Sequence, residues 1–111
     1  MENNQVIGVG GNEGDGHPKT QTQLKIDLVC RNLANFLKEK NIRYGDAALN
    51  PVKIFSKNTT TCSSLVARID DKLNRIINAP LFKKNDVVDL AGYLVLLMID
   101  QEWLDFTEFL D

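Results

Sequence analysis

The chain has 111 residues, of which 43% are hydrophobic and 25% are charged, and its formal net charge is −2 at pH 7. This length allows one domain with a single small core, and the composition is typical of a soluble globular protein. The longest uninterrupted apolar run, residues 93–99, is far shorter than the roughly 20 residues of a membrane-spanning helix, and residues 1–6 do not resemble a signal peptide. We therefore expect a cytoplasmic protein without a membrane segment.

Charge is unevenly distributed along the chain. Residues 38–84 contain ten basic and four acidic side chains, whereas residues 100–111 contain five acidic side chains and no basic one. Domains that bind DNA directly are usually basic as a whole, so direct DNA binding is not expected. A locally basic segment instead favours a phosphorylated small molecule as the ligand.

Residues 1–20 form a glycine-rich polar head. Its glycines do not complete a dinucleotide-binding fingerprint because Glu13 stands at the last glycine position, and a calcium loop would need acids where Gly11 and Thr22 stand. We predict a flexible arm over 1–20 and a single helical domain over 21–111. Cys30 and Cys62 are 32 residues apart and only one histidine is present, so we expect reduced cysteines and no zinc site.

The first predicted helix starts between Thr20 and Thr22, where a threonine caps it, and ends near Lys40. Asn41 interrupts the apolar pattern, and the segment that follows predicts a short connecting turn. Gly45 can supply a left-handed residue there, and Asn50-Pro51 disfavours a continuous helix.

The second predicted helix runs from Ser63 to Asn78, with Ser63 or Ser64 as its cap and Pro80 beyond its end. Its expected buried stripe consists of five apolar residues, namely Leu65, Ile69, Leu73, Ile76 and Ile77. Another side carries a charged ridge, defined here as Arg68, Asp71, Lys72 and Arg75 at helical spacing.

The third predicted helix spans 85–101, with Asn85 as its N-cap. It is apolar nearly all round, which predicts a buried helix, yet Asp86, Asp89 and Tyr93 share one of its faces. Asp86 suits a helix N-terminus, whereas Asp89 lies further inside and needs a cation, a metal or a proton if it is buried.

Residues 101–111 predict an amphipathic C-terminal helix in which Trp103, Phe106 and Leu110 share a face. The sequence thus predicts an all-α fold, a small bundle of three main helices with a connecting turn and a C-terminal helix. Three helices of this size cannot bury every apolar face, so we expect a homo-oligomer, a dimer or a tetramer.

Three short blocks, residues 40–47, 67–75 and 86–93, resemble the nucleotide-modification-associated domains of phages and bacteria. These domains are in turn distantly similar to the all-alpha nucleoside triphosphate pyrophosphatases, the MazG-like and dimeric dUTPase-like enzymes. The resemblance implies a phage-type protein of nucleotide metabolism or modification. It also implies Mg²⁺ held between a Glu-x-x-Glu pair on one helix and a Glu-x-x-Asp pair on the next.

Asp86-x-x-Asp89 matches the second pair in spacing, whereas the chain contains no Glu-x-x-Glu, and the nearest acids on the preceding helix are Asp70 and Asp71. The candidate metal ligands are therefore Asp86, Asp89, Asp71 and Asp70. Adjacent residues lie about 100° apart on a helix, so only one of Asp70 and Asp71 can face the other pair. Whether the protein is an enzyme that releases pyrophosphate stays open.

The candidate ligand-binding residues combine cations with aromatic rings, a set that suits a nucleotide. They are Lys40, Arg43, Tyr44, Asp46, Arg68, Lys72, Arg75 and Tyr93. The bland alternatives are a solvated charged ridge, ion pairs between the ridge and Asp86 or Asp89, and a plain turn at 44–46. A nucleotide-sequestering or sensing protein, and a structural protein that acts through Trp103, Phe106 and Leu110, are the alternative functions.

Overall fold

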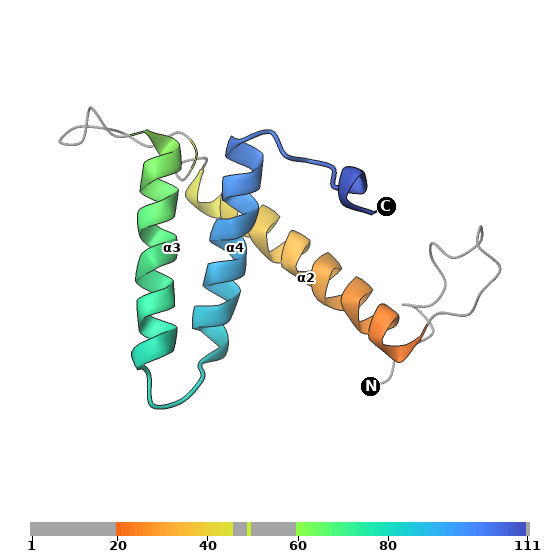
Figure 1. Ribbon diagram of the computed structural model, residues 1–111, viewed down its shortest axis with the longest axis horizontal. Helices are drawn as coiled ribbons and strands as arrows, with labels where there is room; N and C mark the ends of the chain where they lie inside the picture. The colour runs from red at the N-terminus through yellow and green to blue at the C-terminus, as the bar shows by residue number, and fades with distance from the viewer. Residues whose placement is uncertain (1–19, 46–48, 50–59, 111) are drawn as a thin grey trace. The chain divides into compact units, whose positions relative to one another are not determined.

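A computed structural model of the chain describes residues 20–45, 49 and 60–110. In these residues it contains three α-helices, α2 (Gln21–Tyr44), α3 (Thr61–Asn78) and α4 (Lys84–Asp100), a short 3-10 helix, η1 (Thr107–Phe109), and no strand (Figure 1). The predicted all-α class with three main helices is confirmed. The predicted glycine-rich head and most of the predicted connecting turn lie outside the described residues.

Helix α2 begins where the sequence predicts and continues for one turn beyond the predicted end. Gln23 N–H donates to Thr20 Oγ1 at 3.1 Å and Thr20 N–H donates to Gln23 Oε1 at 3.0 Å, so the threonine cap is confirmed. Asn41 does not end the helix. Asparagine is only mildly unfavourable inside a helix, and α2 ends instead at Gly45, whose φ of +68° a glycine adopts without strain.

Helix α3 begins two residues earlier than predicted, and its cap is Thr60 rather than Ser63 or Ser64. Ser63 N–H donates to Thr60 Oγ1 at 3.0 Å, while Thr60 N–H donates to Ser63 Oγ at 3.2 Å. This reciprocal pair satisfies two N–H groups that the first turn leaves without a helical partner. The Thr61 hydroxyl donates to the carbonyl oxygen of Leu49 at 3.2 Å.

Helices α3 and α4 lie side by side as an antiparallel hairpin, joined by a turn over residues 79–83 (Figure 1). Helix α3 ends at Asn78 as predicted, two residues before Pro80. Helix α4 begins at Lys84 with Lys83 as its N-cap and no side-chain cap bond, so the predicted Asn85 cap is wrong. The Lys83 carbonyl accepts hydrogen bonds from the N–H groups of Asp86 at 3.2 Å and Val87 at 3.4 Å, so the helix opens at Lys83 and Asn85 falls inside its first turn.

The seam of the hairpin follows a four-and-three spacing along α3. Its inward positions are Leu65, Ile69, Lys72, Ile76 and Ala79, which are buried or half-buried. Leu73 and Ile77, which the sequence assigned to the buried stripe, are exposed because they lie on the flank of the seam.

Helix α4 is less buried than its apolar composition predicts. Only Asp86 and Gly92 are buried in it, and Val87, Leu94 and Ile99 are exposed. A hairpin of two helices covers one side of each, so a helix that is apolar nearly all round keeps an uncovered side.

The segment after α4 does not form the predicted amphipathic α-helix. Glu102, at φ +62°, ends α4 in a Schellman motif in which Trp103 N–H donates to the Met98 carbonyl at 2.8 Å and Glu102 N–H to the Ile99 carbonyl at 3.0 Å. Among residues 103–110, η1 is the one helical segment, and Asp105 accepts hydrogen bonds from the N–H and the hydroxyl of Thr107. Trp103, Phe106 and Leu110 therefore do not share a helical face.

None of the described helices combines the length and the apolar character that crossing a bilayer requires.

We expect Thr60→Ala to lower the free energy of unfolding by about 1 kcal/mol, because it removes the side-chain acceptor of the α3 cap. Ser64→Ala, at the position that the sequence offered as a cap, is the control and should change the free energy by less than about 0.5 kcal/mol. Urea denaturation followed by circular dichroism measures both. Equal effects of the two substitutions would contradict the assignment of the cap.

Candidate functional site

An ion pair lies in the middle of the α3–α4 seam. Lys72 Nζ is 3.2 Å from Asp89 Oδ2, and the two side chains are 14% and 30% exposed. Lys72 occupies a position that the four-and-three spacing otherwise fills with Leu65, Ile69 and Ile76. Asp89, whose partner the sequence left open, thus receives its positive charge from the neighbouring helix.

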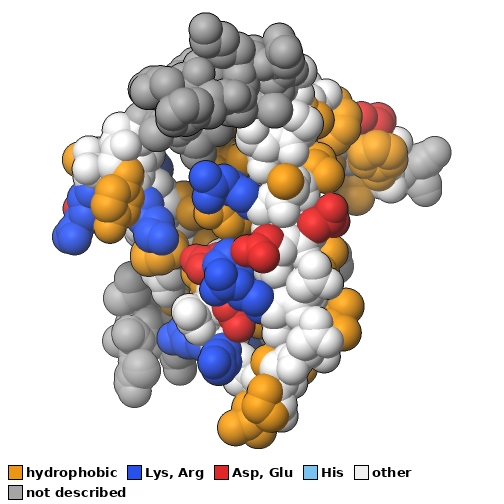
Figure 2. All heavy atoms as spheres, turned by 90° about the vertical axis from the view of Figure 1, so that its left-hand side faces the viewer, with side chains coloured by type: hydrophobic (Ala, Val, Ile, Leu, Met, Phe, Trp, Pro, Cys, Tyr) orange, Lys and Arg blue, Asp and Glu red, His pale blue; other side chains and the backbone are white. Residues whose placement is uncertain are grey.

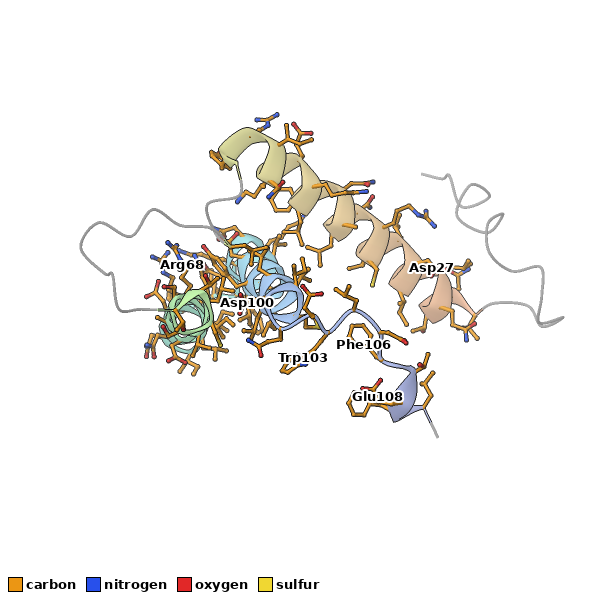
Figure 3. All side chains as sticks on the ribbon, turned by 90° about the horizontal axis from the view of Figure 1, so that it is seen from above. Asp27, Arg68, Asp100, Trp103, Phe106 and Glu108 are labelled. Atoms are coloured by element: carbon orange, nitrogen blue, oxygen red, sulfur yellow. The ribbon has the colours of Figure 1, made fainter. Side chains whose placement is uncertain are left out.

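One helical turn away, Arg68 of α3 meets Tyr93 of α4. A terminal guanidinium nitrogen of Arg68 donates to the Tyr93 hydroxyl at 3.4 Å, and the guanidinium carbon is 5.8 Å from the centroid of the ring. This distance suits a cation–π interaction. Figure 3 looks along the two helices and shows Arg68 on α3. Among the described residues, no carboxylate lies within ion-pair distance of Arg68.

The third basic residue of the ridge, Arg75, pairs within its own helix. Its Nε is 3.6 Å from Asp71 Oδ2, four residues earlier, and both side chains are exposed. The offset that joins Arg68 to Tyr93 and Lys72 to Asp89 brings Arg75 level with Asp86. Asp86 is buried, 6% exposed, in the first turn of α4, where the helix dipole favours an acid.

The three basic residues of the ridge therefore have three different partners. Lys72 is bound to the seam, Arg75 is held by Asp71, and Arg68 keeps guanidinium N–H groups available beside an aromatic ring. Figure 2 shows the result as a cluster in which acidic and basic side chains lie next to one another on the surface.

The four candidate metal ligands lie on two neighbouring helices. Asp86 and Asp89 lie on α4, and Asp70 and Asp71 lie on α3. In the part of the chain that the structure describes, no group of three or more His, Cys, Asp or Glu side chains is placed to hold a metal ion. Lys72 lies against Asp89 and Arg75 lies against Asp71, so a Mg²⁺ ion bound by these two carboxylates would take the place of both cations. The magnesium site stays a prediction.

The remaining candidate residues come from the end of α2. Lys40, Arg43 and Tyr44 are exposed in its last turns, and Asp46 lies outside the described residues. Their role in ligand binding stays a prediction. Cys30 of α2 and Cys62 of α3 are free thiols.

Comparison with known proteins gives no relative from which a function could be transferred: no protein-family model, no curated protein and no solved structure matches this chain.

The sequence interpretation missed the position of Lys72. An ion pair between the charged ridge and Asp86 or Asp89 was one of the alternatives, and Lys72 forms such a pair with Asp89, but the sequence did not place the lysine within the apolar seam. The signal that could have shown this is the four-and-three spacing of Leu65, Ile69, Lys72 and Ile76. Lys72 occupies an apolar position of this heptad pattern, which predicts that it faces the partner helix.

A double-mutant cycle over Lys72→Met and Asp89→Leu measures the seam ion pair. We expect a coupling free energy of about 1–2 kcal/mol, between the ~0.2–1 kcal/mol of exposed pairs and the ~3–5 kcal/mol lost when a fully buried pair is broken. The same cycle over Asp71→Ala and Arg75→Ala is the control, with an expected coupling of about 0.5 kcal/mol or less. Urea denaturation of the natural chain, the four single variants and the two double variants gives the free energies for both cycles. Coupling at the seam no greater than in the control would show that the seam pair is fully screened by water.

Proposed function

We propose that this protein binds a nucleotide or a related phosphorylated compound at the α3–α4 seam, with Arg68 and Tyr93 at the centre of the site. The observation that carries this proposal is the arrangement of these two residues. A guanidinium group without a carboxylate partner among the described residues is suited to bind an oxyanion, and it lies beside an aromatic ring.

The chemistry of such a site follows from the geometry of its groups. Arg68 presents a planar fork of N–H donors that can bind two phosphate oxygens at once. The ring of Tyr93 is half-buried and offers a face against which a base or sugar can pack. The resemblance of residues 40–47, 67–75 and 86–93 to nucleotide-modification-associated domains supports the same class of ligand and a phage-type role in nucleotide metabolism or modification.

Binding without hydrolysis is the form of this function that the geometry favours. A magnesium-dependent pyrophosphohydrolase needs carboxylates that are available to the metal, and Asp89 and Asp71 are engaged by Lys72 and Arg75. A protein that sequesters or senses its ligand needs only the basic and aromatic groups. Incubation with nucleoside triphosphates and Mg²⁺, followed by a pyrophosphate assay, separates the two forms, because product release would establish the enzyme.

Arg68→Gln should weaken nucleotide binding by about 10–100-fold, which corresponds to the ~1.5–3 kcal/mol of a hydrogen bond to a charged group. A thermal-shift screen of ribo- and deoxyribonucleoside triphosphates identifies the ligand, and isothermal titration calorimetry measures its affinity. Arg31→Gln makes the same charge change on α2 and serves as the matched control, with unchanged affinity expected. Equal affinities of the Arg68 variant and the control would overturn the site, and a screen without any binding nucleotide would overturn the function.

The protein is also proposed to assemble as a homo-oligomer. Support comes from large apolar side chains that stay exposed on all three helices, among them Val29 of α2, Ile77 of α3 and Val87 of α4. Exposed apolar surface of this kind commonly marks an interface between proteins.

Light scattering coupled to size-exclusion chromatography should give at least twice the chain mass of 12.5 kDa. A single-chain mass at every concentration up to the millimolar range would contradict the assembly. This result would leave the nucleotide site untouched, because Arg68 and Tyr93 belong to the same chain.

A further inference from the structure

Exposed apolar side chains lie at both ends of α4, beside lysines at one end and beside acidic residues at the other. The first surface is the turn patch, defined here as Ile77, Leu81, Phe82, Lys83 and Lys84. Leu81 and Phe82 are 75% and 83% exposed, and the two lysines follow them directly. Hydrophobic side chains protrude at this lower end of the hairpin, with Lys and Arg side chains nearby (Figure 2).

The second surface is the tail, defined here as residues 101–110. Five of its ten residues are large and apolar, and all five are more than half exposed: Trp103, Leu104, Phe106, Phe109 and Leu110. Its charged side chains, Glu102, Asp105 and Glu108, are all acidic. Figure 3 shows Trp103 and Phe106 on the segment that follows α4.

The tail has local structure of its own. The Schellman motif fixes how it leaves α4, and the bonds from Thr107 to Asp105 and from Leu110 N–H to the Thr107 carbonyl fold its last residues into η1. An exposed apolar segment that is already ordered loses less conformational entropy on binding than a free chain does.

Asp86 in the first turn of α4 matches the helix dipole, but four charged residues that flank the helix oppose it. Lys83 and Lys84 stand at the positive N-terminal end, while Asp100 and Glu102 stand at the negative C-terminal end. These residues therefore do not stabilise the helix that they flank. The lysines at the N-terminal end and the acids at the C-terminal end are, however, opposite in charge to each other.

The tail cannot cover the turn patch of its own chain without losing its structure. Helix α4 has 17 residues, so the two ends lie about 25 Å apart. Ten residues span at most about 33–36 Å when fully extended. Crossing the length of α4 would therefore need most of the tail to be extended, which would open both the Schellman motif and η1. A tail that keeps its Schellman motif and η1 can therefore reach the turn patch of another copy but not that of its own chain.

We propose that the tail of one copy docks on the turn patch of a second copy, and that the second tail docks reciprocally on the first. Two hairpins related by a two-fold axis and running in opposite directions bring each tail to the partner's turn patch, and this arrangement closes into a dimer. Each contact unites eight large apolar side chains, five from the tail and three from the turn patch, with acids facing lysines. This inference rests on the proposed assembly and specifies its geometry.

The test is a charge exchange between the two surfaces, measured by sedimentation equilibrium. The tail-reversed variant is Glu102→Lys/Glu108→Lys, which leaves the Asp105–Thr107 bonds in place, and the turn-reversed variant is Lys83→Glu/Lys84→Glu. Each variant alone should dimerise at least tenfold more weakly than the natural chain. An equimolar mixture of the two, and the chain carrying all four changes, should recover dimers, because every tail then meets a turn patch of opposite charge.

Circular dichroism measures the helix content of each variant and so distinguishes loss of the dimer from loss of the fold. Glu102→Lys and Lys83→Glu/Lys84→Glu place charges at the ends of α4 that its dipole favours, so helicity should be kept or raised while dimerisation falls. A further variant, Leu81→Ser/Phe82→Ser, removes two of the three apolar side chains of the turn patch at exposed positions, and it should also dissociate the dimer.

Three results would overturn the inference. A natural dimer that all these variants leave intact would show that the assembly uses another surface, and the proposed assembly would stand. Variants that dissociate but recover neither in the mixture nor in the fourfold change would show that charge complementarity between these surfaces is not the cause. A natural chain that never dimerises would overturn the assembly together with this inference.

Discussion

The ion pair between Lys72 and Asp89 is the constraint on which the described fold depends. It is an ion pair in a largely apolar seam, and it links the middle of α3 to α4. Apolar side chains alone permit two helices to slide and rotate with little change in buried area. A half-buried charge that must meet its counter-charge removes this freedom, because every other register leaves a lysine or an aspartate without its partner. The contact between Arg68 and Tyr93 follows from the register that this pair sets.

The three basic residues of the ridge on α3 also have different roles. Lys72 serves the seam, Arg75 serves its own helix through Asp71, and Arg68 remains for a ligand. A cluster that looks uniform in sequence thus contains three different electrostatic situations. The proposed nucleotide site and the proposed dimer contacts are separate as well, since the former lies along the seam and the latter lie at the two ends of α4.

Much of the fold was predictable because helix periodicity and capping are local properties. The start of α2 at Thr20 and the end of α3 before Pro80 follow from residues within one turn of each boundary. The errors arose where a residue competes with its neighbours. Asn41 is too weak a breaker to end a helix before Gly45, and Thr60 displaces Ser63 as the cap by using Ser63 as its reciprocal partner. The sequence did not reveal that the predicted C-terminal α-helix is absent, because Glu102 adopts a left-handed conformation that sequence patterns assign to glycine. For the site, spacing placed Asp86, Asp89 and Tyr93 on one face, but the choice of Lys72 as the partner of Asp89 depends on the packing of two helices.

The five-residue turn between α3 and α4 and the polar contact in their seam have a joint consequence for how such a hairpin can vary. Loop length is tolerated over a wide range, because lengthening a flexible connection costs little free energy. A change in the register of the two helices is not tolerated, because a slip of one residue would rotate Lys72 away from Asp89. Insertions in the turn should therefore bulge outward as surface loops and leave the paired helices unmoved. In a lineage of such chains, the connection would diverge in length while the spacing within each helix stayed fixed.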